Sequence, residues 1–289
     1  MKKLSIIIPV YNEEKVVGQT IEELKNELHK ISGLEYEIIV VNDCSSDNTR
    51  QILEKIEGIK IINHPYNKGY GSSLKTGIKN AKFELLLFFD ADGQHPAEEI
   101  GNLLKYTDEY DLVAGARIKG EYKGPSLRLP GKKILNVIAN YLVGMKIPDL
   151  NCGFRIVKKR EILKFLHILP VGFSFSTTST LAFIKEGLNT KFVPIEVKKR
   201  IGKSTVRPKD AFKMLILILR IILLFSPLRV FLPVSLILFL IATVSGSLDI
   251  ILGPFNISDT TILFFISSLL IFFFGLLADQ LAAIRREIK

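Results

Sequence analysis

Apolar positions follow two different patterns along the chain, and the change falls at about residue 210. Before that point short apolar runs alternate with amphipathic segments; after it, two runs of 19 residues carry no charge. Short runs separated by helical patterns are typical of a parallel α/β sheet. An uncharged run of about 20 residues is long enough to cross a bilayer as a helix. The pattern therefore predicts an α/β domain followed by membrane-spanning helices.

The first region is expected to alternate between strands and helices. We expect strands at residues 4–10, 35–41, 59–63, 83–89 and 111–114, and helices at residues 13–31, 69–81 and 96–106, with another that ends near residue 56. Asn12 is expected to cap the first helix, with Glu13 and Glu14 in its first turn, where the helix dipole favours acids. The run 83–89 is apolar throughout, as a strand covered on both faces requires.

The second region contains the uncharged runs, residues 230–248 and 260–278. The apolar segment before them carries Lys209, Lys213 and Arg220, whose spacing of four and seven puts them on one helix face. We interpret this segment as an amphipathic helix on the membrane surface. A third span here, or two buried core helices in place of the spans, are the alternatives. The expected domains are 1–210, 211–228 and 229–289.

Basic residues flank the two predicted spans on one side only. Arg229 precedes the first span, and Arg285, Arg286 and Lys289 follow the second, while the connecting loop has no lysine or arginine. The positive-inside rule then places both termini and the predicted α/β domain in the cytosol. The expected location is the cell membrane, crossed twice.

Charge and cysteine content narrow the choice of partners. The formal net charge is +10, and residues after 210 contribute only +2 of it, so the water-soluble region is the basic one. An anionic partner is expected: nucleic acid, a phosphorylated substrate or lipid headgroups. The cysteines, Cys44 and Cys152, lack metal-site spacing and give no disulfide framework, which favours a reducing compartment.

The segment DADGQ directly follows the most apolar predicted strand. Asp90 and Asp92 can place two carboxylates near one point, and Gln94 can add a carbonyl oxygen, which are ligands suited to Mg²⁺ or Mn²⁺. Gly93 allows the backbone to turn sharply. The alternative is a simple turn that caps the next helix. Further polar or turn residues follow the other strands, where α/β sheets bind ligands: Pro9, Tyr11, Glu13, Asp43 and Arg117.

Four motifs carry a family resemblance: IIIPVYNEE, VNDCSSDNT, DADGQHP and NCGFR. In this order and spacing the chain resembles glycosyltransferase family 2, and with two C-terminal spans it is similar to the dolichyl-phosphate mannosyltransferase and polyprenyl-phosphate glucosyltransferase group. The resemblance implies a GT-A fold, which is Rossmann-like with a mostly parallel sheet. It implies metal-dependent, inverting transfer of a hexose from a nucleotide sugar to dolichyl or polyprenyl phosphate. Mannose from GDP-mannose is the first expectation and glucose from UDP-glucose the second.

The resemblance also implies residue roles. Donor contacts are expected from Pro9, Tyr11, Glu13, Val41, Asp43, Asp90, Ala91, Asp92, Arg117, Arg200 and Lys203. The metal is expected at Asp90, Asp92 and Gln94. The catalytic residues are expected to be Asp92, Arg117 and Arg128, and the acceptor phosphate is expected to contact Arg117, Arg128 and Lys132. Thr205 follows Ser204 in RIGKST, where the family has lysine. Which lysine of this chain closes over the diphosphate is therefore left open.

Other readings fit less well. A processive polysaccharide synthase would carry a Gln-x-x-Arg-Trp motif, and this chain has no tryptophan. A dinucleotide site at GYGSSL has Leu74 where the third glycine belongs. A membrane-anchored scaffold with an inactive transferase domain is disfavoured by the intact aspartates, and nucleic-acid binding by the two spans. A homo-oligomer stays open. Arg155 is expected to be structural, His64 to lie at the surface or in a turn, and His95 to lie near the metal turn.

Overall fold

The computed structural model describes residues 1–119, 140, 144, 147–172, 174–197, 223, 226–252 and 257–287. The chain divides into two compact units, one of residues 1–136 with 146–211, the other of residues 137–145 with 212–289. Predictions for Arg128, Lys132, Arg200, Lys203 and most of the surface helix at 211–228 lie outside the described residues. The expected domain boundaries therefore stay a prediction.

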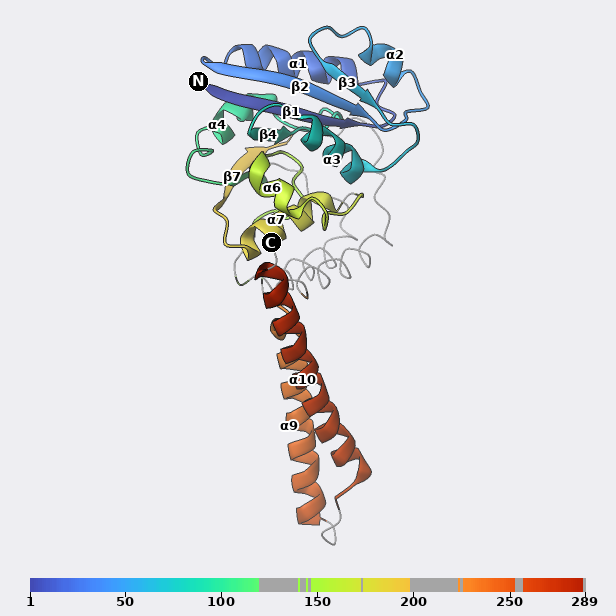
Figure 1. The fold of residues 1–289 in the computed structure, drawn as a ribbon, viewed down its shortest axis with the longest axis vertical. Coiled ribbons are helices and arrows are strands. Elements are labelled where there is room, and N and C mark those ends of the chain that lie inside the picture. The colour runs from blue at the N-terminus through green and yellow to red at the C-terminus, as the bar shows by residue number, and fades with distance from the viewer. Residues whose placement is uncertain are drawn as a thin grey trace. The chain divides into compact units, whose positions relative to one another are not determined.

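The first unit is built on a seven-stranded sheet, ordered β3-β2-β1-β4-β6-β5-β7 (Figure 1). Its strands are β1 (Lys2–Val10), β2 (Leu34–Asn42), β3 (Lys60–Asn63), β4 (Leu85–Phe88), β5 (Leu112–Lys119), β6 (Arg155–Lys158) and β7 (Thr190–Glu196). Neighbouring pairs are parallel except where β6 runs antiparallel to β4 and β5. The expected parallel sheet is thus confirmed in its first four strands, and β6 makes the whole sheet mixed.

The helices of this unit are α1 (Val17–His29), α2 (Thr49–Leu53), α3 (Tyr70–Asn80), η1 (Ala97–Glu99), α4 (Ile100–Leu104), α6 (Lys159–Phe165) and α7 (Phe175–Lys185). The prediction that Asn12 caps the first helix is wrong. Asn12 adopts a left-handed conformation with φ of 54°, and α1 begins only at Val17, with no acid in its first turn. The residues between them serve the site described below instead.

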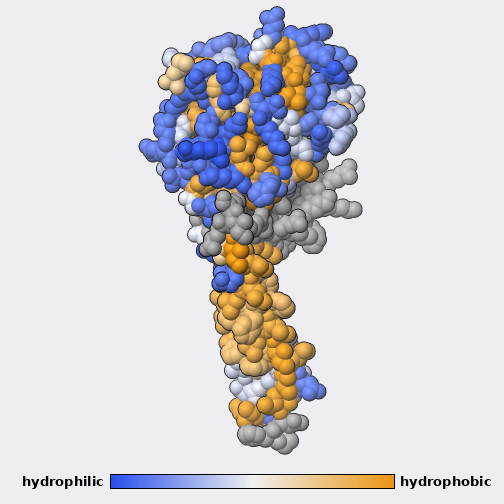
Figure 2. Space-filling view, viewed as in Figure 1, coloured by the Kyte–Doolittle hydropathy of each residue, from blue (hydrophilic) through white to orange (hydrophobic). Residues whose placement is uncertain are grey.

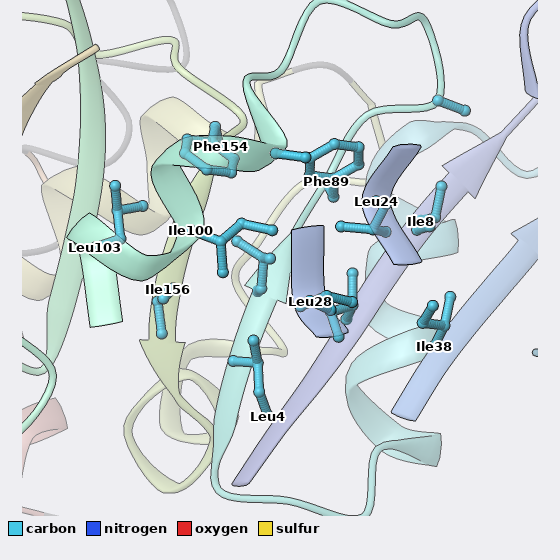
Figure 3. Close-up of a cluster of buried hydrophobic side chains, with 14 of the residues drawn as sticks. Leu4, Ile8, Leu24, Leu28, Ile38, Phe89, Ile100, Leu103, Phe154 and Ile156 are labelled. Carbon is cyan, nitrogen blue, oxygen red and sulfur yellow. The ribbon is translucent and has the colours of Figure 1, made fainter. Parts of the chain in front are cut away.

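Alternating residues of β1 bury both faces of the sheet. Leu4, Ile6 and Ile8 point into the core beneath α1 and α4, where Figure 3 shows Leu24 and Leu28 of α1 close to them. Ile7 points to the other face, where the Cβ of any larger residue at Gly77 of α3 would lie 2.3 Å from its side chain. A central strand buried on both faces holds its carboxyl end rigidly, and the functional residues follow that end.

The fully buried Arg155, at the start of β6, ties the sheet to α7. Its guanidinium donates to the Cys152 carbonyl, to the Ser176 carbonyl at 2.8 Å and to the Thr180 hydroxyl at 2.8 Å. Burial lowers the pKa of this arginine. The hydroxyl-rich first turns of α7 therefore solvate a buried cation, which agrees with a structural role for Arg155.

The second unit contains a helical hairpin, α9 (Leu228–Leu252) and α10 (Asp259–Glu287). Its candidate spans, Leu228–Ile251 and Asp259–Ile284, have mean hydropathies of 2.2 and 2.5 and are mostly exposed, and Figure 2 shows their surface as predominantly hydrophobic. Phe231 packs against Gly275, where a Cβ would lie 2.6 Å away. Long apolar helices that leave most of their surface uncovered by protein are suited to a lipid environment.

Candidate functional site

A pocket of about 450 Å³ opens where β1, β2 and β4 end. Its lining residues are Pro9, Val10, Tyr11, Glu13, Asp43, Asn67, Gly69, Tyr70, Ser73, Asp90, Ala91, Asp92, Gln94, Asn151, Gly153 and Ser176. Eight of the residues expected to bind donor or metal therefore share one cavity, although they are up to 85 positions apart in sequence. We call the part around Asp43 and Asn67 the β2 end of the pocket, and the part around residues 90–94 the β4 end.

The loops that follow β1 and β2 are joined by hydrogen bonds across the β2 end. The backbone N–H of Asn12 donates to Ser45 Oγ at 3.0 Å, and the backbone N–H of Ser46 donates to Asn12 Oδ1 at 2.8 Å. Cys44, like Asn12, has a left-handed backbone, with φ of 59°. Such conformations are costly for residues other than glycine and are retained where the surroundings hold them in place. The paired loops fix the positions of Tyr11 and Glu13 at the pocket rim.

Asp43 is buried and binds its own chain with both carboxylate oxygens. Oδ1 accepts from Lys68 N at 2.8 Å and lies 2.7 Å from His64 Nδ1, while Oδ2 accepts from Gly69 N at 2.7 Å. His64 Nε2 in turn lies 2.9 Å from Thr76 Oγ1 of α3. The prediction that His64 lies at the surface or in a turn is wrong in its surface part, since this residue is buried and orients Asp43.

At the β4 end, the DADGQ segment forms a tight turn. Gly93 has φ of +71°, as the sequence suggested, and Gln94 N donates to Asp92 Oδ1 at 3.1 Å. The Asp90 carboxylate accepts from the Tyr70 hydroxyl at 2.9 Å on Oδ1 and lies 3.3 Å from His95 Nε2 on Oδ2. Burial, followed by the charge of Asp90, raises the pKa of Tyr70 well above its ordinary value. The Tyr70 hydroxyl therefore stays protonated and donates a hydrogen bond to Asp90.

The residues at the β4 end fit a hard cation whose coordination shell is completed by a substrate. The described residues hold no group of three histidine, cysteine or acidic side chains that could enclose a metal alone. The turn does present two carboxylates and an amide to one pocket, and Mg²⁺ or Mn²⁺ is commonly held by one or two carboxylates together with substrate phosphates and water. Asp90, Asp92 and Gln94 would hold such an ion.

Arg117 is held beside the pocket by a partner that the sequence reasoning missed. Its Nε and Nη2 donate to the two Asp149 oxygens at 2.6 and 2.9 Å, a bidentate pair. Burial opposes both charges, but this pairing outweighs it, so the pKa of Arg117 is raised and that of Asp149 is lowered. Arg117 is absent from the pocket lining, and its side chain is 39% exposed. It is a fixed cation near the site, and its expected role in phosphate binding stays a prediction.

Two further points of the sequence analysis can be placed in the structure. The Val41 side chain is fully buried in β2 and is absent from the pocket lining, and its expected contact with the donor stays a prediction. In the GYGSSL segment the Cβ of a larger residue at Gly71 would lie 2.3 Å from the Pro170 carbonyl oxygen. Ser72 N at the start of α3 donates to Val171 O. These contacts to residues 170 and 171 agree with the sequence analysis, in which a dinucleotide site at this segment was disfavoured.

The sequence analysis missed several pocket residues, because only the fold brings them to the pocket. Tyr70, Asn151, Gly153 and Ser176 come from α3, from the loop before β6 and from α7. Gly153 belongs to a motif quoted only for its resemblance, and Tyr70 to a segment treated as a turn. Nothing in the local sequence indicates that these residues approach Asp90.

Comparison with known proteins agrees with this geometry. Residues 5–164 match the family model "Glycosyl transferase family 2", and residues 226–284 match "GtrB C-terminal hairpin". The chain belongs to glycosyltransferase family 2 and is an enzyme of that class, with a GT-A fold.

Individual relatives indicate which group of the family the chain falls into. An uncharacterised protein of Methanocaldococcus jannaschii is 33% identical over 67% of this chain and 81% of its own length. A dolichyl-phosphate beta-glucosyltransferase of Trichomonas vaginalis is 30% identical over 75% of this chain and 72% of its own. Among solved structures, Mycobacterium tuberculosis glucosyl-3-phosphoglycerate synthase with Mn²⁺ and UDP has a TM-score of 0.59 at 17% identity, covering 76% of this chain and 80% of its own. The chain thus falls with the polyprenyl-phosphate glycosyltransferase group.

Proposed function

We propose that this protein transfers a hexose from a nucleotide sugar to a polyprenyl or dolichyl phosphate at a membrane surface. The observation that carries the proposal is the pocket, which brings the acidic turn at 90–94 together with Tyr11, Glu13 and Asp43. The apolar hairpin supports a lipid acceptor, because it would hold the enzyme at the bilayer where such a lipid resides. The positive-inside distribution of basic residues favours cytosolic termini.

The chain's residues can be assigned parts of an inverting displacement. The β2 end would hold the nucleoside, and Asp90, Asp92 and Gln94 would hold the divalent ion, which supplies stabilisation of charge on the leaving diphosphate. The acceptor phosphate is already anionic at neutral pH, so no side chain is needed to remove a proton from it. Arg117, together with Arg128 and Lys132, would bind that phosphate. Arg200 and Lys203 would contact the diphosphate.

For the donor we propose UDP-glucose. The named relative that transfers glucose to dolichyl phosphate supports it, and this support is what moves the preference from the GDP-mannose suggested by the family resemblance. GDP-mannose is the second candidate, since the group includes mannosyltransferases and no pocket residue described above selects one base over the other.

The test uses the detergent-solubilised full chain with a polyprenyl phosphate and Mn²⁺ or Mg²⁺. Labelled UDP-glucose, GDP-mannose and UDP-N-acetylglucosamine are offered in parallel, and label that moves into the organic phase identifies the donor. Chelation with EDTA is expected to stop the transfer. If every donor fails to label the lipid while nucleotide binding is intact, the proposed acceptor is wrong.

A further inference from the structure

We propose that Tyr70 and His95 are positioning residues that hold the Asp90 carboxylate in one orientation before substrate arrives. The proposal rests on the proposed function, since Asp90 is assigned there to the divalent ion. It assigns a role to two residues from different elements, the first residue of α3 and the turn before η1. We refer to Tyr70, His95 and Gly153 together as the Asp90 clasp.

Tyr70 binds one oxygen of the carboxylate and is itself held in place. Its hydroxyl donates to Asp90 Oδ1 at 2.9 Å. Ser176 of α7 lies beside the same hydroxyl, and its backbone is fixed by the buried Arg155, which donates to its carbonyl at 2.8 Å. The hydroxyl is therefore held at the carboxylate within surroundings that are themselves fixed.

His95 faces the other oxygen, and its geometry defines which ring nitrogen carries hydrogen. The Asp90 backbone N–H donates to His95 Nδ1 at 2.9 Å, so Nδ1 must be an acceptor. The ring hydrogen then lies on Nε2, which is 3.3 Å from Asp90 Oδ2. Phe89 and Phe154 pack against the ring with centroids 5.5 and 5.3 Å away. The imidazole is thus held with Nε2 beside the carboxylate.

Gly153 completes the clasp by being small. A Cβ at this position would lie 2.8 Å from Asp90 Oδ2 and 3.1 Å from the Tyr70 hydroxyl oxygen. The main chain of residue 153 can therefore approach the carboxylate directly. The carboxylate is confined by the Tyr70 hydroxyl at Oδ1, by the His95 ring near Oδ2 and by the backbone of residue 153, and it lines the pocket.

The arrangement has a functional consequence for cation binding. A carboxylate that is already confined to one rotamer loses less conformational entropy when it coordinates an ion, and hydrogen bonds to ligating groups orient them toward the metal. Oδ1 uses part of its accepting capacity on the Tyr70 hydroxyl and keeps the rest for a ligand. The clasp thus prepares Asp90 for the ion at the side of the pocket nearest α7.

The experiment measures Mn²⁺ binding to the detergent-solubilised full chain by the EPR signal of the free ion, with UDP or GDP present. Tyr70→Phe removes the hydroxyl and keeps the ring, and we expect it to weaken Mn²⁺ binding about 10-fold. Tyr36→Phe is the matched control, because it removes a hydroxyl that contacts His29 at 2.9 Å in the half-buried first part of β2. The control is expected to bind Mn²⁺ as the wild type does.

His95 provides a second pair of variants that differ in the retained atom. His95→Gln can place an amide donor where Nε2 lies, whereas His95→Asn retains a group only at the Nδ1 position, and both lose the aromatic packing. The clasp predicts tighter Mn²⁺ binding for glutamine than for asparagine. Equal Mn²⁺ affinities for wild type and Tyr70→Phe, or asparagine matching glutamine, would overturn the clasp and leave the proposed function standing. Absence of Mn²⁺ binding by the wild type with either nucleotide would overturn both.

Discussion

The two ends of the pocket each place a carboxylate after a buried parallel strand, yet they bind it in different ways. At the β2 end Asp43 is 3% exposed and accepts from the backbone amides of Lys68 and Gly69. At the β4 end the Asp90 side chain is 28% exposed, and its oxygens face the side chains of Tyr70 and His95. The first carboxylate organises a loop, and the second is held ready in the cavity.

The difference shows how similar residues acquire separate roles. The donors to Asp43 include the backbone N–H groups of Lys68 and Gly69, which a change of side chain at those positions would not remove. The Asp43 carboxylate therefore defines the shape of the loop at 67–69. At Asp90 a side-chain donor, the Tyr70 hydroxyl, holds a carboxylate that also lines the pocket. The comparison predicts that changes at the β4 end reduce turnover, whereas changes at Asp43 first reduce stability.

The largest effect is expected for Asp92→Asn. Replacing this carboxylate removes a charged ligand from the proposed cation site, so we expect metal-dependent turnover to fall by at least about 100-fold. The thermal midpoint should stay near that of the wild type, because Asp92 is only partly buried. Initial rates of lipid labelling, with a melting curve of the same preparation, measure both quantities. Full activity in this variant would break the assignment of the β4 end to the ion.

Gly153→Ala tests the same end through space alone. The added Cβ would lie 2.8 Å from Asp90 Oδ2, so the carboxylate or the loop must shift, and we expect turnover to fall about 10- to 100-fold. Gly172→Ala is the matched control, since nothing lies within 4 Å of its Cβ position. Steady-state rates of the two variants should therefore differ widely. Similar rates for both would show that the close approach at Gly153 has no role.

Asp43→Asn sharpens the contrast at the β2 end. The amide group would face at least one N–H donor of the loop, which leaves a buried donor without an acceptor at a cost of about 2 kcal/mol. We expect the thermal midpoint to fall by about 4–8 °C. Asp108→Asn is the control, because its side chain is 79% exposed and pairs only with Lys2 among the described salt bridges. An unchanged midpoint for Asp43→Asn would mean that the loop does not depend on these contacts.

The smallest effect concerns the Arg117–Asp149 pair and pH. The pKa of Asp149 is lowered from 3.8 in the folded protein, because the hydrogen bond from Arg117 outweighs the opposing effect of burial. The pair therefore stabilises the fold fully above that ordinary value, and the stabilisation is lost as pH falls through the lowered pKa. Between pH 7 and pH 3 we expect the wild type to lose about 2–4 °C more in thermal midpoint than Asp149→Asn. Parallel melting curves across this range provide the measurement, and identical pH profiles would contradict the prediction.

Local sequence patterns predicted the strands with most success. The short apolar runs of β1 to β4 placed each of these strands close to its observed position, because burial on both faces demands nearly continuous apolar character. The uncharged runs likewise located α9 and α10. Neither β6 nor β7 was predicted. β6, at Arg155–Lys158, begins with a buried arginine and ends with a lysine within only four residues, so its local pattern does not indicate a strand.

The sequence predicted those residues of the candidate site that directly follow a strand. Asp43, Asp90, Asp92 and Gln94 were expected together because the carboxyl ends of parallel strands share one edge of a sheet. Asp149 and His64 were not expected as partners. Each is recognisable only once the fold brings it within 3 Å of the charged group that it holds.

The sequence by itself determined the two regions of this protein, the strands that lead into the site and the acidic turn at 90–94, since these follow from apolar periodicity and from residue chemistry at neighbouring positions. Only the tertiary structure decided what Asp43 and Asp90 contact. Their partners come from positions 5 to 26 residues away, from loops and helices whose local patterns are uninformative. Hydrogen bonds extend over about 3 Å, so they are specified by the folded backbone and not by order along the chain.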